Sequence, residues 1–262
     1  MHNKRILHNA SFDGRCYGRA AHFTLSAGLL AAVVGSAVAC NREVYSPPSQ
    51  LFAMPAARAL RQGETAASAT AAHQGTLFDP SLDVAELGLR HGITDEFDVE
   101  GSAGYAVVSG AEAADLDPRL ITGRVGVIAN PKRGAFTFRG GVGGGHNPSV
   151  GNFAAVDVGV TAAYHNCVVT PAIGTSGFVS NPIDPKPVNV APASATAADM
   201  RSPYTTVGWT MSSSLSMQLD RASCRQGRAG TTLSFGFNVS EVANGNGNSA
   251  WAGLGLRLEG SL

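Results

Sequence analysis

The stretch from Thr206 to Leu219 reads TVGWTMSSSLSMQL, and its side chains alternate between two kinds. Large apolar residues occupy one set of positions, while hydroxyl, glycine and amide residues occupy most of the other. A period of two residues is typical of a β-strand with one apolar face, because successive side chains point to opposite sides of a sheet. The stretch therefore predicts a strand that separates an apolar environment from a polar one.

The same period recurs along most of the chain after the first sixty residues. Clear repeats occupy 97–107, 121–127, 136–142, 156–164, 232–240 and 252–259, and weaker ones occupy 63–72, 84–91 and 167–178. No segment in this part of the chain has the 3.6-residue apolar period of an amphipathic helix. With the opening stretch, the pattern predicts an all-β fold of about 10 strands (8–10).

The predicted connections between these strands alternate in length. Short turns are expected at 92–95, 130–134 and 165–166, and longer connections at 74–82, 109–118, 146–151, 180–203 and 241–249. Consecutive strands joined in this way form an antiparallel up-and-down meander. Transmembrane barrels have short periplasmic turns and longer outer loops. An even number of strands would place both ends of the barrel on the periplasmic side.

A soluble sandwich or barrel would also alternate, so the composition of the two faces has to decide. The polar face is mostly glycine, serine, threonine and alanine, which suits the crowded interior of a narrow closed sheet. The apolar face carries no charge, as a lipid-facing surface requires. Charged residues make up only 15% of the chain, against about 25% in ordinary soluble domains. These features favour a membrane barrel over a soluble lipid-anchored one.

Residues 59–262 resemble the small β-barrel proteins of the Gram-negative outer membrane. The hairpin Gly88-Leu89-Arg90-His91-Gly92-Ile93-Thr94-Asp95-Glu96-Phe97-Asp98-Val99 is similar to their strand, short turn and strand units. The resemblance implies an antiparallel up-and-down transmembrane β-barrel in the outer membrane. Its partners would be outer-membrane lipid and, during biogenesis, the barrel-assembly machinery. Pro171 lies inside one predicted strand, so we expect either a bulge or a shorter strand there.

The first 39 residues have the pattern of a secretory signal peptide. Basic residues precede an uncharged apolar run from Phe23 to Ala39, which ends in small residues before Cys40. Small residues followed by cysteine are similar to the lipobox of bacterial lipoproteins, which implies a covalent lipid at Cys40. The same residues would also serve an ordinary signal peptidase, and this alternative stays open.

The domain organisation predicted from these features has three parts. Residues 1–39 form the signal peptide, 40–58 a lipidated N-terminus and linker, and 59–262 the β-barrel domain. The linker is rich in proline and has no periodic pattern, as a tether to a lipid anchor would be. An extended arm packed on the domain is the alternative.

Two cysteines remain in the predicted barrel domain, Cys167 and Cys224. The export signal places them in a compartment that permits disulfides. Cys167 follows a predicted short turn, and Cys224 lies in a connection at the same rim. We therefore predict a disulfide between them.

Nine charged residues fall on the inward face of the predicted strands. Arg90 and Asp98 have the spacing of an opposed cross-strand pair, and Asp157 lies diagonal to Arg139 with Gly141 leaving room. Nearly balanced charges in a narrow barrel should form a paired network that blocks flow. The set is Glu86, Arg90, Asp98, Glu100, Arg124, Arg139, Asp157, Arg257 and Glu259.

The sequence offers no catalytic constellation, cofactor motif or metal site. The glycine-rich run 140–145 lacks the strand-to-helix context of a phosphate loop, and the histidines lack metal-ligand spacing. A net charge of zero without a basic run argues against nucleic-acid binding. We predict a non-enzymatic outer-membrane lipoprotein with a structural or interaction role and an occluded lumen. A narrow channel and a soluble lipid-anchored binding protein are the alternatives, and the oligomeric state is left open.

Overall fold

The computed structural model of the protein describes residues 46–55, 60–76, 80–109, 117–131, 134–189, 198–220, 222, 230–244 and 247–262. Contacts divide the chain into two units, residues 1–40 and 41–262, and every described residue belongs to the second. The predicted signal peptide and Cys40 therefore lie outside the described residues. No helix among the described residues is long and apolar enough to cross a membrane.

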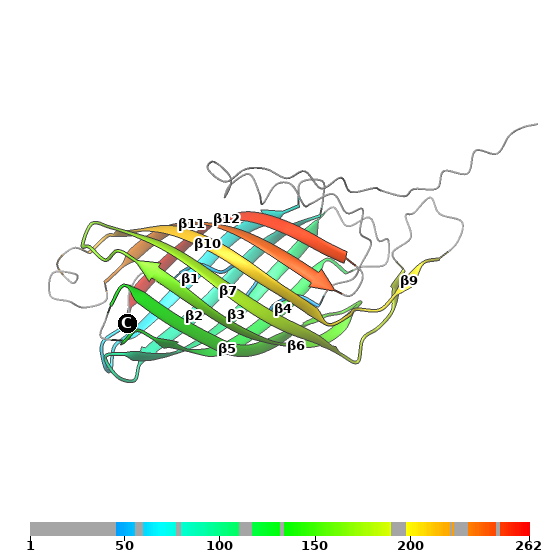
Figure 1. The fold of residues 1–262 in the computed structure, drawn as a ribbon, viewed down its shortest axis with the longest axis horizontal. Helices are drawn as coiled ribbons and strands as arrows, with labels where there is room; N and C mark the ends of the chain where they lie inside the picture. Colours follow the sequence, from blue (N-terminus) through cyan, green and yellow to red (C-terminus); the bar gives the residue numbers. More distant parts are fainter. Residues whose placement is uncertain are drawn as a thin grey trace, which may run out of the picture. The chain divides into compact units, whose positions relative to one another are not determined.

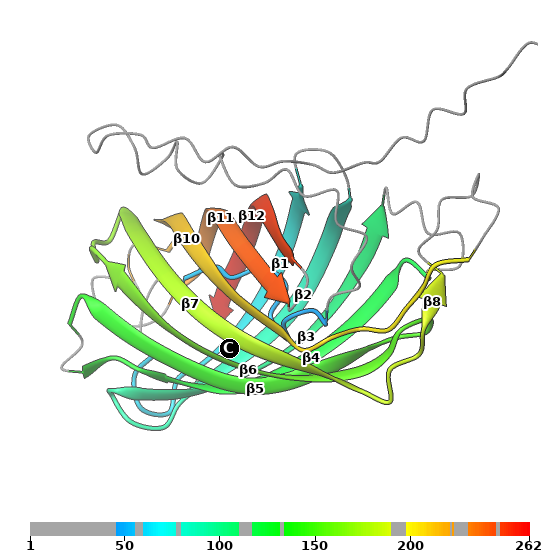
Figure 2. The ribbon, with the colours of Figure 1, turned by 45° about the vertical axis from the view of Figure 1, so that its right-hand side comes forward.

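Ten antiparallel strands close into a barrel (Figures 1 and 2). Each strand pairs with its neighbours along the chain, and the ring closes where β1 pairs with β12. This architecture confirms the predicted all-β up-and-down barrel. The strands are β1 (Thr65–Gly75), β2 (Ser81–Gly92), β3 (Phe97–Ser109), β4 (Arg119–Ala129), β5 (Phe136–Asn147), β6 (Gly151–Ala163), β7 (Val169–Ile183), β10 (Thr206–Gln218), β11 (Thr232–Asn244) and β12 (Gly247–Ser261).

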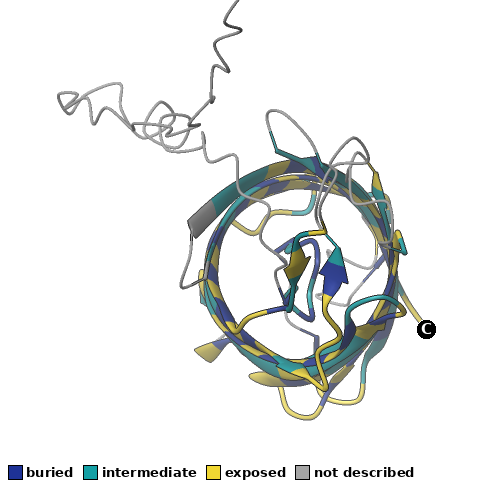
Figure 3. Ribbon diagram, turned by 90° about the vertical axis from the view of Figure 1, so that its right-hand side faces the viewer, coloured by how far each residue is buried: buried dark blue, intermediate teal, exposed yellow. Residues whose placement is uncertain are grey.

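The barrel is polar inside and apolar outside. In β10, the outward-facing Val207 exposes 54% of its surface and Leu215 exposes 45%. Ser214, which faces the lumen on the same strand, exposes 7%. The same alternation colours the whole ring in Figure 3, which looks along the barrel. A soluble barrel would bury its leucines and valines. An apolar outer surface around a polar interior is instead the arrangement of a barrel surrounded by lipid. The strands, 11 to 15 residues long, also match the length needed to cross a bilayer at a tilt.

Charge on the outer face is confined to one end. Among the outward-facing positions of the described strands, the charged residues are Asp83, Arg119 and Glu241, all near the same end. Trp209 donates from its indole Nε1 to Glu241 at 3.0 Å there, as aromatic residues do at a membrane interface. Exposed aromatic rings also mark the opposite end, at Phe97, Phe136 and Tyr164. The uncharged surface between them is the membrane-spanning band.

The two ends of the barrel differ in their connections. We call one the turn end, with connections 93–96, 130–135, 164–168 and 219–231, and the other the loop end, with 76–80, 110–118, 148–150, 184–205 and 245–246. The connections predicted to be long at 146–151 and 241–249 are short, because their flanking strands extend further than the apolar pattern did. The 184–205 connection carries the two-residue strands β8 (Val188–Asn189) and β9 (Met200–Arg201).

Pro171 produces neither a bulge nor a shorter strand. It lies near the start of β7 on the outward face, and the register with β10 continues through it. Its carbonyl accepts a hydrogen bond from the backbone N–H of Tyr164 at 3.0 Å. Proline removes only the donor, and near the first residues of a strand that loss is tolerated.

Candidate functional site

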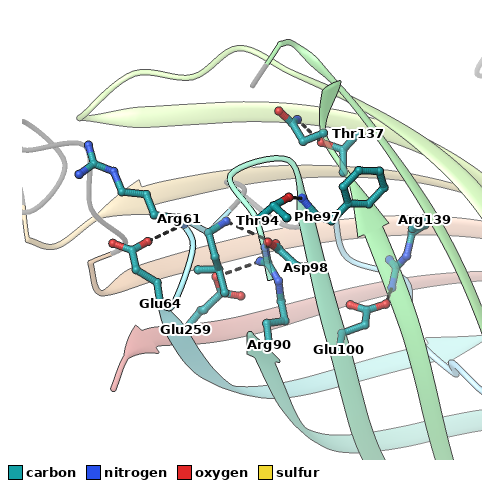
Figure 4. A network of polar contacts seen from close by, with 12 residues as sticks. Arg61, Glu64, Arg90, Thr94, Phe97, Asp98, Glu100, Thr137, Arg139 and Glu259 are labelled. Carbon is teal, nitrogen blue, oxygen red and sulfur yellow. Dashed lines mark hydrogen bonds and ion pairs between the residues drawn. The ribbon is translucent and has the colours of Figure 1, made fainter. Parts of the chain in front are cut away.

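The lumen holds two groups of ion pairs on one wall of the barrel. In the first, at the turn end, Arg90 Nη2 lies 2.6 Å from Asp98 Oδ2 and Nη1 lies 3.3 Å from Glu259 Oε1 (Figure 4). Arg257 Nη2 contacts the second oxygen of Glu259 at 2.5 Å. Only 3% of the Arg90 side chain is exposed. These contacts join β2, β3 and β12 across the point where the barrel closes.

The second group is centred on Arg124 of β4. Its Nε and Nη2 bind the two carboxylate oxygens of Asp157 on β6, at 2.7 and 2.8 Å. Its Nη1 binds Glu100 of β3, and the same carboxylate accepts a hydrogen bond from Arg139 Nη2 at 3.1 Å. The bidentate geometry fixes the guanidinium plane as well as its charge. Arg124 thus connects β3, β4 and β6, and Arg139 adds β5 through the shared carboxylate of Glu100.

Two glycines make the space that the Arg124 guanidinium occupies. A Cβ at Gly141 would lie 2.5 Å from Arg124 Cζ, and a Cβ at Gly126 would lie 2.8 Å from Nη1. Both glycines face the lumen. Gly126 lies on β4, as Arg124 does, and Gly141 lies on the neighbouring strand β5. The glycine-rich inner face of β5 therefore leaves space for the buried side chain of Arg124.

One cross-strand pairing in the lumen differs from that expected from the spacing. The residue opposite Arg90 in the β2–β3 register is Glu100, and Asp98 opposes Gly92. The reason is the turn, whose Thr94 Oγ1 accepts hydrogen bonds from the backbone N–H of Glu96 and Phe97 and centres the hairpin one residue later than expected. Arg90 still reaches Asp98 because that carboxylate is its diagonal neighbour.

The predicted diagonal placement of Asp157 and Arg139 is confirmed, since Gly159 opposes Arg139 and Gly141 opposes Asp157 in the β5–β6 register. The two side chains have other ion-pair partners, however: Asp157 is bound by Arg124, and Arg139 pairs with Glu100. Gly141 does leave room, as expected, but Arg124 fills it from β4. Glu86 faces the lumen and, among the described residues, forms no ion pair, whereas the other members of the predicted set all do.

A segment that precedes the barrel fills the rest of the lumen. We call residues 46–55 the lumen segment. Its Phe52 and Met54 are each only 2% exposed. A Cβ at Gly255 would lie 2.5 Å from Phe52 Cε1, and one at Gly236 would lie 2.8 Å from Met54 Cε. The two apolar side chains therefore seat in gaps that glycines leave in β12 and β11.

The lumen segment is hydrogen-bonded to the barrel wall at its first residue and near its middle. Ser46 donates from its backbone N–H to Thr206 Oγ1 at 3.0 Å, and its hydroxyl lies 2.8 Å from Ser180 Oγ. The carbonyl of Leu51 accepts a hydrogen bond from Gln74 Nε2 at 2.5 Å. The Leu51 side chain packs in a buried apolar cluster at the loop end of the lumen, which contains Val84, Ala106, Leu120 and Phe153.

These contacts decide between two interpretations of residues 46–55. These residues pack on the inner wall of the barrel. They therefore form the packed arm that was the alternative to a free tether. The sequence contained a signal for this, since Leu51-Phe52 and Met54 are apolar in a segment otherwise rich in proline and serine. These apolar residues follow no regular period, because the side chains that they contact come from several different strands.

Hydroxyl groups line the opposite wall of the lumen. The inward faces of β7, β10 and β11 there carry no charge. Ser216 and Ser234 bond to each other at 2.8 Å, but Ser214 Oγ, Thr232 Oγ1 and both amide atoms of Asn238 have no hydrogen-bond partner in the described protein. This hydroxyl wall consists of Thr170, Ser180, Thr206, Thr210, Ser212, Ser214, Ser216, Thr232, Ser234 and Asn238.

At the loop end, Asp117 and Asn147 tie two connections together. Asn147 Nδ2 donates to the carbonyls of Asp117 and Arg119, each at 2.8 Å, and the Asp117 N–H donates to Ser149 Oγ at 2.7 Å. The Asp117 carboxylate accepts hydrogen bonds from the side chain and backbone of Arg119, which lower the pKa of Asp117 to about 2.

The remaining predicted residues cannot be placed together. Cys167 lies in the connection before β7, whereas Cys224 and Cys40 lie outside the described residues. The predicted disulfide and the lipid at Cys40 therefore stay predictions. Within the described ranges, no three His, Cys, Asp or Glu side chains gather as metal ligands would.

No protein-family model and no curated protein matches the sequence. Solved structures do match. The β domain of the Bordetella autotransporter BrkA is 11% identical, with a TM-score of 0.42 over 77% of this chain and all of that one. Neisserial surface protein A is 9% identical, with a TM-score of 0.37 over 75% of this chain and 95% of that one. The N-terminal barrel domain of Pseudomonas aeruginosa OprF is 8% identical, with a TM-score of 0.34 over 76% of this chain and 98% of that one.

These neighbours are outer-membrane barrel proteins, and at such identities the likeness concerns the fold alone. The membrane assignment rests on the chain's own surface, a closed barrel with an uncharged apolar band. Closed barrels of this kind span the bacterial outer membrane. The chain is an outer-membrane β-barrel.

Proposed function

We propose that the protein is a non-enzymatic outer-membrane lipoprotein whose barrel is occluded and serves as a scaffold for the connections at its loop end. The observation that carries the proposal is the doubly filled lumen. Ion pairs hold one wall together, and the lumen segment seats Phe52 and Met54 between that wall and the hydroxyl wall. A filled barrel of this width gives rigidity and leaves its loops as the surface available to partners.

Conductance in planar bilayers tests the occlusion. The full-length mature protein should show little or no steady current. Deletion of residues 46–55 should produce a stable open state, because the ion pairs alone occupy only one wall. Steady large channels in the unmodified protein would contradict the proposal.

A second variant keeps the proposal testable if the deletion variant fails to assemble. Gly255→Val places a branched side chain where Phe52 now sits and should displace the lumen segment without removing it. Gly177→Ala is the control, since a Cβ there makes only an ordinary contact at 3.7 Å, with a backbone carbonyl. Gly255→Val should raise conductance and Gly177→Ala should leave it unchanged.

A narrow channel is the second candidate, and the hydroxyl wall is the observation in its favour. Unpartnered hydroxyl and amide groups at Ser214, Thr232 and Asn238 can bind water or a small polar solute. In this case the lumen segment would be a gate, and current would rise when it leaves. Spontaneous opening of the full-length protein in single-channel records would favour this function.

A further inference from the structure

The described residues before β1 make contacts at both ends of the barrel. Ser46 contacts Thr206, the first residue of β10, and Ser180, near the last residue of β7. Both lie at the loop end. Further along the chain, the N–H of Leu60 donates to Asp98 Oδ2 at 3.3 Å, at the start of β3 and hence at the turn end.

The direction of the chain therefore differs from that expected of a periplasmic tether. β1 does begin at the turn end, as an even number of strands requires. The residues before it, however, have already passed through the lumen from the loop end. A chain that leaves Ser46 in the N-terminal direction leaves the barrel at the loop end.

The length of chain before Ser46 limits where an anchor at Cys40 can reach. Six peptide units separate Cys40 from Ser46, and at about 3.3–3.6 Å per residue they span at most about 22 Å. The apolar band of an outer-membrane barrel is about 25 Å tall. The lumen route back is occupied by the segment itself, so an acyl chain at Cys40 can enter only the leaflet at the loop end.

We infer that the mature N-terminus is displayed at the loop end and that its lipid lies in the outer leaflet of the outer membrane. The inference rests on the proposed lipidation of Cys40 and on the orientation of outer-membrane barrels, whose longer connections face outward. While the lumen segment is in place, a lipid attached to Cys40 cannot reach the periplasmic leaflet. The barrel is thus the route by which its own anchor reaches the cell surface.

Epitope accessibility on intact cells tests the side. An epitope inserted between Arg42 and Glu43 should bind antibody without permeabilisation. The same epitope after Ala193, in the 184–205 connection, is the control for the outside, and one after Asp95, in the 93–96 turn, is the control for the periplasm. Binding at residue 42 only after permeabilisation would overturn the inference.

A designed disulfide tests the threading independently of the side. Ser46→Cys with Ser180→Cys should form a bond on mild oxidation, since the two hydroxyls are 2.8 Å apart. Ser46→Cys with Ser216→Cys, whose second position lies near the turn end of β10, is the matched control and should not. Equal cross-linking of the two pairs, or none in the first, would contradict threading.

Mass spectrometry of the mature protein separates the two proposals. Acylated Cys40 with an epitope inside the cell leaves the lipoprotein proposal intact and overturns this inference. Unmodified Cys40 with an epitope outside overturns the lipid and its leaflet, while the surface display of the N-terminus stands.

Discussion

Single glycines decide where the buried charges of this barrel can lie. Arg124 binds both oxygens of Asp157 and one of Glu100 from a position that only Gly141 and Gly126 leave open. Charges buried in this way are stabilising only when their geometry is good, because each loses its hydration. The residue types facing an arginine therefore matter as much as its carboxylate partners.

Gly141→Ala should destabilise the barrel by about 1–3 kcal/mol. The added methyl group overlaps the Arg124 guanidinium, which cannot move aside without breaking its bidentate pair with Asp157. Gly140→Ala is the matched control on the same strand, because its Cβ would meet its nearest neighbour at an ordinary 3.7 Å. Urea unfolding of the two variants in phospholipid vesicles measures the difference. Equal midpoints would show that Arg124 is loosely held.

Asp117 should titrate far below an ordinary aspartate. Hydrogen bonds from Arg119 lower its pKa to about 2, whereas an unfolded aspartate titrates near about 3.9. A depressed folded-state pKa means that the contribution to stability is complete above about pH 4 and is lost as the pH falls through about 2. NMR titration of the Asp117 carboxyl group should find the low midpoint, and Arg119→Ala should return it towards 4. An unchanged midpoint in that variant would contradict the assigned cause.

At the scale of elements, alternation carried most of the information. All ten barrel strands and both of their faces followed from the period of two, even where the pattern was weak, as in β1. Register did not follow, because a hydroxyl in one turn, that of Thr94, moves every pair in the β2–β3 hairpin. The lumen segment was also beyond a periodic pattern, since its contacts come from many strands at once, β1, β7, β10, β11 and β12 among them.

A disulfide between Cys167 and Cys224 would join two elements at the turn end. Cys167 lies between β6 and β7, and Cys224 belongs to the 219–231 connection between β10 and β11. Closing a loop of roughly sixty residues should add a few kcal/mol of stability. Non-reducing peptide mapping of protein from the outer membrane should recover the linked pair. Two alkylated thiols under these conditions would remove the bridge.

The whole molecule is asymmetric about its axis. β2 to β6 and β12 supply all nine predicted lumen charges, while β7, β10 and β11 supply an uncharged hydroxyl wall. The lumen segment lies between the two walls and touches both. Since the charged wall is tied together by ion pairs and the hydroxyl wall keeps unpartnered groups at Ser214, Thr232 and Asn238, water that enters an emptied barrel should follow the hydroxyl wall.

Thiol labelling of Ser214→Cys should locate that path. In protein lacking residues 46–55 and with Cys40→Ser, a membrane-impermeant thiol reagent should modify residue 214 and lower the conductance, because the hydroxyl side chain is directed into the lumen with no partner. With the lumen segment present, modification should be slowed at least tenfold. Leu215→Cys, one residue along the same strand, is the matched control, since its side chain faces lipid and its modification should not change the current. Rapid modification of Ser214→Cys in the full-length chain would mean that the hydroxyl wall is open to solvent while the segment is in place, and that the barrel is a channel with a partial constriction.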